Sequence, residues 1–233
     1  MSDALGPGPK SRVRRLPAKA NYDRDTIFAI IDEAPLCHVA GIVNGAAVVI
    51  PTLHAREGHT LYLHGSPSNA VMKAIVERGE ACVSVTLYDG LRLARSGFES
   101  SIAYRSVVLF GAVSLVRDDA EKARVLDMFV DAVLPGRAGE VRAMSDAEVR
   151  LTMVVAVRID EASAKMSSGP TDDPDEDLDL PVWSGTVPAR ILFGTPIPDA
   201  NGAMADGTVP VPASVTRLLE KAWCYRSRPE CKA

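Results

Sequence analysis

Tight turns between short apolar segments most constrain how this chain can fold. The segments 37–43 and 46–50 are rich in Val, Ile and Ala, and only Asn44-Gly45 separates them. Asn-Gly favours the two-residue turn that joins neighbouring antiparallel strands. Further strands are expected at 61–64, 81–87, 91–95, 105–116 and 152–159. The sequence therefore predicts a mainly β fold of the α+β class, in which antiparallel strands close into a small barrel with helices outside it.

Helices are expected at the periphery of this barrel. Asp25 is a suitable N-cap for the first, which precedes Pro35. The others are expected at 68–78, where Gly79 follows as a C-cap, at 119–133 and at 214–223.

Composition divides the chain into four predicted regions. A Gly/Pro-rich and then basic stretch predicts a flexible arm at 1–20. The barrel is expected at 21–166, an acidic linker at 167–180, and an extension that packs on the barrel at 181–233. Six carboxylates crowd the linker, which predicts a solvated segment.

Charge and hydropathy exclude several classes of partner. The net charge of -4 gives no support for nucleic acid or an acidic membrane surface as a partner. No apolar run approaches the ~20 residues of a membrane-spanning helix, and the first residues lack the apolar core of a signal peptide. The four cysteines are scattered. We therefore expect a cytoplasmic protein without disulfides.

Two segments predict a phosphate site. In 61–69 a strand breaks at Gly65-Ser66-Pro67 and leads into a helix that continues past Lys73. Free N–H groups and the helix dipole at such a helix start suit a phosphate. Arg105, at the start of another strand beside Ser106, can close on the same anion with a fork of donors. A phosphate-bearing cofactor held against the sheet is the expected ligand.

The sequence contains no catalytic motif of its own. The four histidines lack the spacing of a metal site, and no serine lies in a Gly-x-Ser-x-Gly elbow. His64 ends the strand before Gly65, where it can donate to a ligand oxygen or satisfy a nearby carbonyl. We expect no metal, and we expect any chemistry to belong to a bound cofactor.

An ordered set of motifs extends over residues 22–188. It comprises Cys37-His38-Val39-Ala40, Val49-Ile50-Pro51-Thr52, Leu61-Tyr62-Leu63-His64-Gly65-Ser66, the stretches 85–96 and 104–111, Pro135-Gly136-Arg137, Ser163-x-Lys165 and Trp183-x-Gly185. Together these motifs resemble the pyridoxamine 5′-phosphate oxidase-related flavin-binding family. Within it they are most similar to the branch that includes nitroimidazole-resistance proteins.

The resemblance implies a split β-barrel that binds FMN, or less often FAD, at the interface of a homodimer. By this resemblance, the isoalloxazine ring is expected along Val49, Ile50, Pro51 and Thr52, and the phosphate at His64, Gly65, Ser66, Ser68, Asn69 and Lys73. Arg105 and Ser106 are expected to complete the phosphate and ribityl contacts, and Trp183 to cover the ring, from this subunit or its partner.

Two departures from the family pattern bear on function. Many relatives carry Arg-Lys after the His-Gly-Ser turn, where this chain has Ala70-Val71. The Arg-x-His clamp of pyridoxamine phosphate oxidases does not occur at 183–193. We therefore expect no oxidation of pyridoxamine phosphate.

The expected function is an FMN-dependent oxidoreductase that acts on a small aromatic or nitro-type acceptor, with His64 as the best candidate for a catalytic residue. The alternatives are a flavin-binding or flavin-sensing dimer without turnover, and a barrel that serves only as an interaction module.

Overall fold

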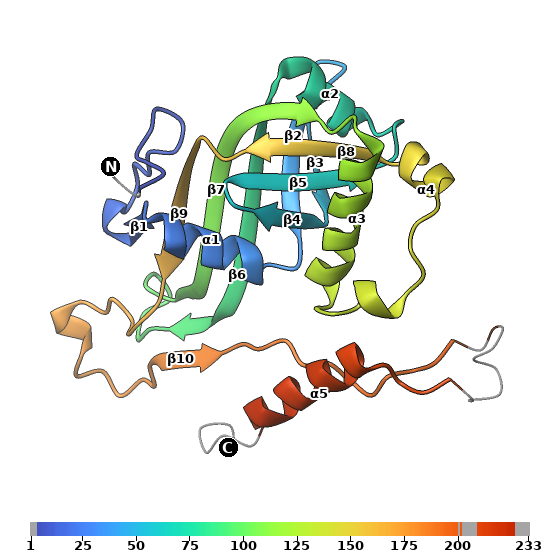
Figure 1. Ribbon diagram of the computed structural model, residues 1–233. Coiled ribbons are helices and arrows are strands. Elements are labelled where there is room, and N and C mark those ends of the chain that lie inside the picture. The colour runs from blue at the N-terminus through green and yellow to red at the C-terminus, as the bar shows by residue number, and fades with distance from the viewer. Residues whose placement is uncertain (1–3, 200, 202–208, 227–233) are drawn as a thin grey trace. The chain divides into compact units, whose positions relative to one another are not determined.

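Long antiparallel strands organise the computed structural model, which describes residues 4–199, 201 and 209–226 (Figure 1). The strands are β1 (Ala20–Asn21), β2 (Cys37–Val43), β3 (Ala46–Thr52), β4 (His54–Glu57), β5 (Thr60–Gly65), β6 (Glu80–Leu93), β7 (Ser101–Leu115), β8 (Met153–Arg158), β9 (Glu161–Ser167) and β10 (Gly185–Pro188). The helices are α1 (Arg24–Glu33), α2 (Ala70–Arg78), α3 (Asp119–Val133), α4 (Asp146–Leu151) and α5 (Ala213–Arg226), with short 3-10 turns at Pro17–Lys19 (η1), Ala138–Glu140 (η2) and Asp175–Asp177 (η3).

Strand β7 connects two layers of the sheet. One edge pairs with β6 from Ser101 to Ala112, while the other pairs first with β9 and then, from Val113 to Leu115, with β8. The sheet order is β3-β2-β6-β7-β8-β5-β4, and every pair in it is antiparallel. The predicted class, an antiparallel split barrel with peripheral helices, is confirmed.

Alternation along the strands builds two hydrophobic clusters. Leu61 and Leu63 of β5 point into the larger cluster between the layers, which α1 and α2 close. Tyr62 points the other way, into a smaller cluster with Phe129 of α3 and Val149 of α4. Because successive side chains of a strand alternate, β5 is buried on both faces. This burial fixes its register against β8.

The helix ends follow local capping chemistry. Gly79 adopts φ 72° after α2, which confirms the expected C-cap. The expected cap of α1 was wrong by two residues, since the side chain of Asp23 accepts from the Thr26 amide and Asp25 lies in the first turn. Both residues are good N-caps, and only the extended backbone at Asp23 decides between them.

The two separate strands that were expected at 81–87 and 91–95 form a single strand. β6 continues from Glu80 to Leu93, with a bulge between Tyr88 and Gly90. The prediction of a separate strand at 91–95 was wrong because a bulge uses the same turn-forming residues without reversing the chain. Four further elements, β1, β4, β9 and α4, were not predicted. The capping box of Ser145 and Glu148 was the available signal for α4.

The segment from Ala4 onward lies against the edge of β9. Leu5 is buried, donates to the Tyr22 carbonyl at 3.0 Å and accepts from the Ala162 amide at 2.9 Å. The carboxylate of Glu161 accepts from the amide and the hydroxyl of Ser11. The described part of the predicted arm is therefore held by the sheet.

The chain divides into two compact units. The first comprises 1–129 and 144–190 and contains the barrel, and the second comprises 130–143 and 191–233. In the second unit Glu140 accepts from the amide of Ser214 at 2.9 Å and from its hydroxyl at 2.5 Å. None of the described helices is long and apolar enough to cross a bilayer.

The crossing of β7 and β8 predicts a strict requirement for glycine. A Cβ on Gly111 would overlap the carbonyl oxygen of Arg158, whereas a Cβ on Gly97 would meet no atom within 4 Å. Gly111→Ala should lower the free energy of unfolding by about 3 kcal/mol, because two backbones must separate. The control Gly97→Ala should change it by less than about 0.5 kcal/mol. Urea unfolding measures both, and equal effects would contradict this account.

Candidate functional site

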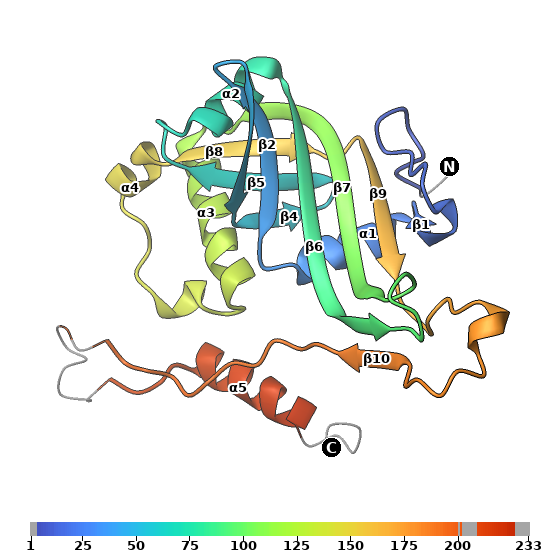
Figure 2. The same ribbon diagram turned by 180° about the vertical axis from the view of Figure 1, so that it is seen from behind.

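Five strands expose one face that no helix of the barrel covers. Side chains of β2, β3, β6, β7 and β9 alternate between the larger cluster and the opposite side, which is called the outer face below. Figure 2 shows β2, β6 and β7 from this side, with the helices of the barrel beside or behind them. The outer face includes His38, Ala40, Ile42, Ala47, Val49, Pro51, Cys82, Ser84, Thr86, Tyr88, Tyr104, Ser106, Val108, Phe110, Glu161, Ser163 and Lys165.

The four residues predicted to run along the flavin ring split between two faces. Val49 is 60% exposed and pairs with Ala40, so it belongs to the outer face with Pro51. Ile50 and Thr52 have the opposite parity, and Ile50 packs against the larger cluster. Only two of the four side chains can therefore contact a ligand on the outer face.

The predicted phosphate loop already satisfies several of its own donors. Asn69 caps α2, and its side-chain oxygen accepts from the amides of Val71 and Met72, both at 3.1 Å. The hydroxyls of Ser66 and Ser68 bond to each other at 2.7 Å. A phosphate that accepts from these two amides would have to replace Asn69 Oδ1. Lys73 is exposed one turn further along α2.

His64 lies on the α3 side of β5, away from the outer face. Its ring meets that of Phe129 edge-on, with centroids 4.3 Å apart. Within the described part of the chain its buried Nδ1 has no hydrogen-bond partner, so the imidazole does not satisfy a carbonyl through this atom. Burial lowers the pKa of His64, which favours the neutral ring. Gly65 follows at the end of β5.

Arg105 and Ser106 point to opposite faces of β7. The guanidinium of Arg105 makes four hydrogen bonds of 2.6–2.9 Å, two to Glu33 at the end of α1 and two to Asp89. These carboxylates, Glu33 foremost, raise the pKa of Arg105. Ser106 lies on the outer face, and its hydroxyl donates to the Lys165 carbonyl at 3.3 Å. The structure does not bring this pair together on one anion.

Trp183 precedes β10, which pairs with the end of β6. Its side chain is 66% exposed, and its ring lies over Gly185. Gly90 adopts φ 144°, and a Cβ there would overlap the carbonyl of Val187. Only glycine at this position allows β10 to pair so closely, and this pairing holds the segment that carries Trp183.

Two arginines bind the start of the acidic segment, an arrangement that sequence reasoning missed. Arg92 is only 4% exposed and donates to the Ser167 hydroxyl at 3.0 Å and to the Pro170 carbonyl. Arg95 donates to Asp173 from its amide at 2.7 Å and from its guanidinium at 3.0 Å. The Asp173 side chain is 2% exposed. The sequence offered one signal for this arrangement, namely the presence of two arginines in 92–95 and of a run of acidic residues in 172–179.

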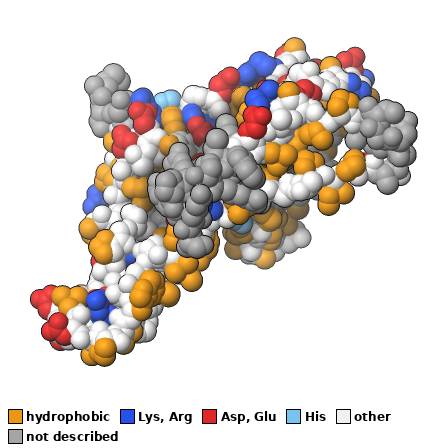
Figure 3. Space-filling model, turned by 90° about the horizontal axis from the view of Figure 1, so that it is seen from below, with side chains coloured by type: hydrophobic (Ala, Val, Ile, Leu, Met, Phe, Trp, Pro, Cys, Tyr) orange, Lys and Arg blue, Asp and Glu red, His pale blue; other side chains and the backbone are white. Residues whose placement is uncertain are grey.

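The rest of the acidic run faces solvent. Asp175, Glu176 and Asp179 are exposed around η3, and Figure 3 shows red acidic side chains gathered at the left end, where Figure 1 places this segment. The expected solvated linker therefore describes the later part of the segment, while its start is docked on the barrel.

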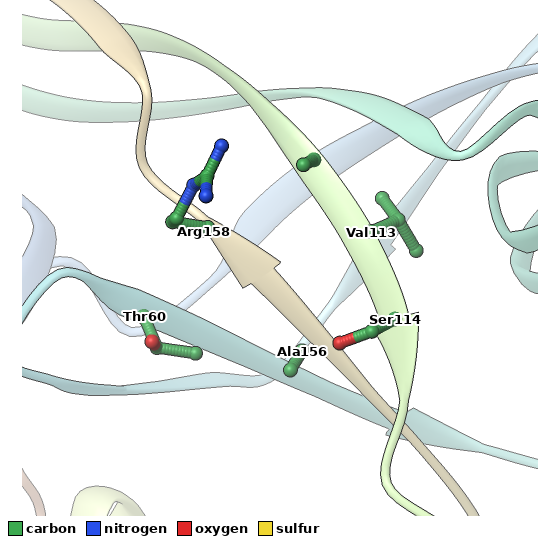
Figure 4. Close-up of a pocket in the computed structure, with 6 residues that line it drawn as sticks. Thr60, Val113, Ser114, Ala156 and Arg158 are labelled. Carbon is green, nitrogen blue, oxygen red and sulfur yellow. The ribbon is translucent and has the colours of Figure 1, made fainter.

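A pocket of about 320 Å³ lies elsewhere on the barrel. It is lined by Thr60, Ala112, Val113, Ser114, Ala156 and Arg158, from β5, β7 and β8 (Figure 4). None of the residues predicted to bind flavin contributes to it. Within the described residues, the predicted flavin contacts are spread over the outer face, the α2 loop, the α3 side and the α1 side.

Comparisons with known proteins support a single family. The family model of pyridoxamine 5′-phosphate oxidase matches residues 23–166. The flavocytochrome Anf3 from Azotobacter vinelandii is 37% identical, with a TM-score of 0.84 over 90% of this chain and 96% of that one. A FAD and heme binding protein from Mycobacterium smegmatis is also 37% identical, with a TM-score of 0.79 over 85% and 96%.

A more distant structure comes from Bacteroides thetaiotaomicron. This protein, assigned to 5-nitroimidazole antibiotic resistance, is 26% identical, with a TM-score of 0.54 over 63% of this chain and 85% of that one. A search of curated proteins found no match.

The Arg95–Asp173 pair predicts a pH-dependent contribution to stability. Hydrogen bonds from Thr171 and Arg95 hold the pKa of Asp173 below its ordinary 3.8. The ionised carboxylate therefore stabilises the fold above about pH 4, and this contribution is lost as the pH falls through the lowered pKa. Asp173→Asn should reduce resistance to urea at pH 7, and the difference from wild type should fade towards pH 3.

The matched control is Asp175→Asn, which removes an exposed carboxylate of the same segment. It should leave the urea midpoint nearly unchanged at both pH values. A loss in Asp173→Asn that is equally large at pH 3 would assign the effect to packing instead of charge.

Proposed function

Because the chain belongs to the pyridoxamine 5′-phosphate oxidase family, to which residues 23–166 match, we propose that it is a flavin-dependent oxidoreductase. The family resemblance expected from the sequence is confirmed. The observation that carries the proposal is the 37% identity, over most of the chain, to a flavocytochrome and to a FAD and heme binding protein. Bound flavin supplies hydride and single-electron transfer, and the protein supplies orientation and shielding from water.

The outer face has the chemistry that a flavin requires. One row across four strands consists of Val49, Ala40, Cys82 and Phe110, and Glu161 of β9 lies at its end. The four apolar side chains offer a surface to a flat aromatic ring. The neighbouring rows carry the hydroxyls of Ser84, Ser163, Thr86 and Ser106, which can bond a polyol chain. The residues present therefore fit the cofactor that the family implies.

A second copy of the chain would complete this site. Large apolar side chains are exposed on and beside the outer face, among them Ile42, Val49 and Tyr88. Such side chains are common at the buried centre of obligate interfaces. A homodimer with flavin between the subunits, in which Trp183 of one copy covers the ring in the other, accounts for this exposure.

The type of flavin and the class of electron acceptor are proposed from different relatives. The sequence predicts FMN, whereas the description of the mycobacterial relative favours FAD. The distant relative assigned to 5-nitroimidazole resistance supports a small nitro-aromatic acceptor. A flavin-binding dimer without turnover is the alternative if the bound flavin accepts no electrons from NAD(P)H.

Heme is a second candidate cofactor. Both 37%-identical relatives are described as a flavocytochrome or as heme-binding. A histidine can bind heme iron only through an unprotonated ring nitrogen. His64 has a ring whose pKa is lowered by burial and whose Nδ1 is unpaired in the described part of the chain. We propose that His64 would hold the heme iron, and a heme bound there would supply one-electron chemistry beside that of the flavin.

The first test is the visible spectrum of the purified protein, followed by release and identification of its cofactors. Flavin absorption bands, reduced on addition of NAD(P)H and restored by a nitro-aromatic acceptor, are expected. Protein that is colourless and binds neither added FMN nor added FAD would refute the proposal. Light scattering of the same sample measures the expected dimer.

His64→Ala should abolish heme binding and leave flavin binding intact, since His64 lies on the opposite side of the strands from the outer face. The Soret band measures heme, and the released flavin is quantified separately. The control His59→Ala removes an exposed histidine and should retain both cofactors. Unchanged heme content in His64→Ala would remove this residue from the site.

A further inference from the structure

One row of the outer face places a cation beside two hydroxyl groups. Thr86 lies directly opposite Ser106 across β6 and β7, and Ser106 lies directly opposite Lys165 across β7 and β9. Opposed residues in antiparallel strands have Cα atoms about 4.5–5.5 Å apart and share a face. The three side chains therefore stand side by side.

Lys165 differs from the other cations of the described strands, namely Arg56, Arg92, Arg105 and Arg158, in its lack of an acidic partner. Among the described residues its ammonium has no ion pair and no hydrogen bond, and the row contains no carboxylate. By contrast, Arg105 is held by Glu33 and Asp89 on the other face of the same sheet. An unpaired and half-buried cation can bind an anion without first breaking an internal ion pair.

The order of the rows matches the order of groups in a flavin phosphate. The apolar row of Val49, Ala40, Cys82 and Phe110 comes first. The next row, two residues along each strand, carries His38, Ser84, Val108 and Ser163. The row with Lys165 is two residues further. Rows on one face are about 7 Å apart, so the apolar surface and the cation are separated by about 14 Å.

We propose that Lys165, with the hydroxyls of Ser106 and Thr86, binds the ribityl-linked phosphate that FMN and FAD share. The inference rests on the proposed flavin binding and deepens it. It assigns the phosphate to the outer face, on which the ring and the polyol chain also find suitable surfaces. Arg105 then has a structural role, in which it ties the end of α1 to the bulge of β6.

The experiment compares ligands that differ only in the phosphate. Apoprotein is titrated with FMN, FAD and riboflavin, and binding is followed by quenching of flavin fluorescence. Wild type should bind FMN more tightly than riboflavin. Lys165→Gln should weaken FMN and FAD by about 10- to 100-fold and leave riboflavin unchanged, because only the phosphate contact is lost. The control Arg78→Gln removes an exposed cation of α2 and should retain the preference for FMN.

The outcomes separate this inference from the proposed function. A preference for FMN that survives in Lys165→Gln would overturn the inference, as would its loss in Arg105→Gln or Lys73→Gln alone. Equal binding of FMN and riboflavin by wild type would show that no phosphate site exists, while flavin binding itself stands. Failure of wild type to bind any of the three would refute both. Circular dichroism of each variant confirms that it is folded.

Discussion

The antiparallel pairing of β6 with β7 is the constraint on which the rest of the barrel depends. The pairing extends over most of both strands, and the far edge of β7 changes partner from β9 to β8. Because of this change of partner, β7 belongs to both layers of the sheet. The larger cluster is therefore enclosed between antiparallel strands, and no crossover between parallel strands is needed. The absence of a Cβ at Gly111 permits the close backbone contact where the layers meet.

The alternation of side chains along these strands places residues with different roles on opposite faces of the sheet. A strand presents successive side chains to opposite faces, so neighbours in sequence can serve unrelated purposes. Arg105 binds two carboxylates on the α1 side, while Ser106 faces outward beside Lys165. The outer face consequently combines an apolar row that ends at Glu161, rows of hydroxyl groups, and the cation Lys165. A surface of this composition suits a cofactor with an aromatic ring, a polyol and a phosphate.

The acidic segment shows how charge positions a strand that is weak in itself. β10 is four residues long and pairs only with the end of β6. Upstream of it, Arg92 and Arg95 fix the chain at Ser167, Pro170 and Asp173. Buried charged groups are stable only when they are paired, so these contacts are specific to one docking geometry. Trp183 lies between the segment that these arginines bind and β10.

The sequence alone determined the antiparallel class, the Asn44-Gly45 hairpin, the capped α2 and the family, because turn residues, caps and collinear motifs are local signals. It could not tell a bulge from a turn at Asp89-Gly90, since both use the same residues. Nor could it assign Arg105, because a pattern of residue types does not specify which carboxylates lie across the fold. The tertiary structure places Glu33 and Asp89 against Arg105, and it leaves Lys165 without an acidic partner among the described residues. Only the tertiary structure therefore decided that Lys165, and not Arg105, lies on the outer face.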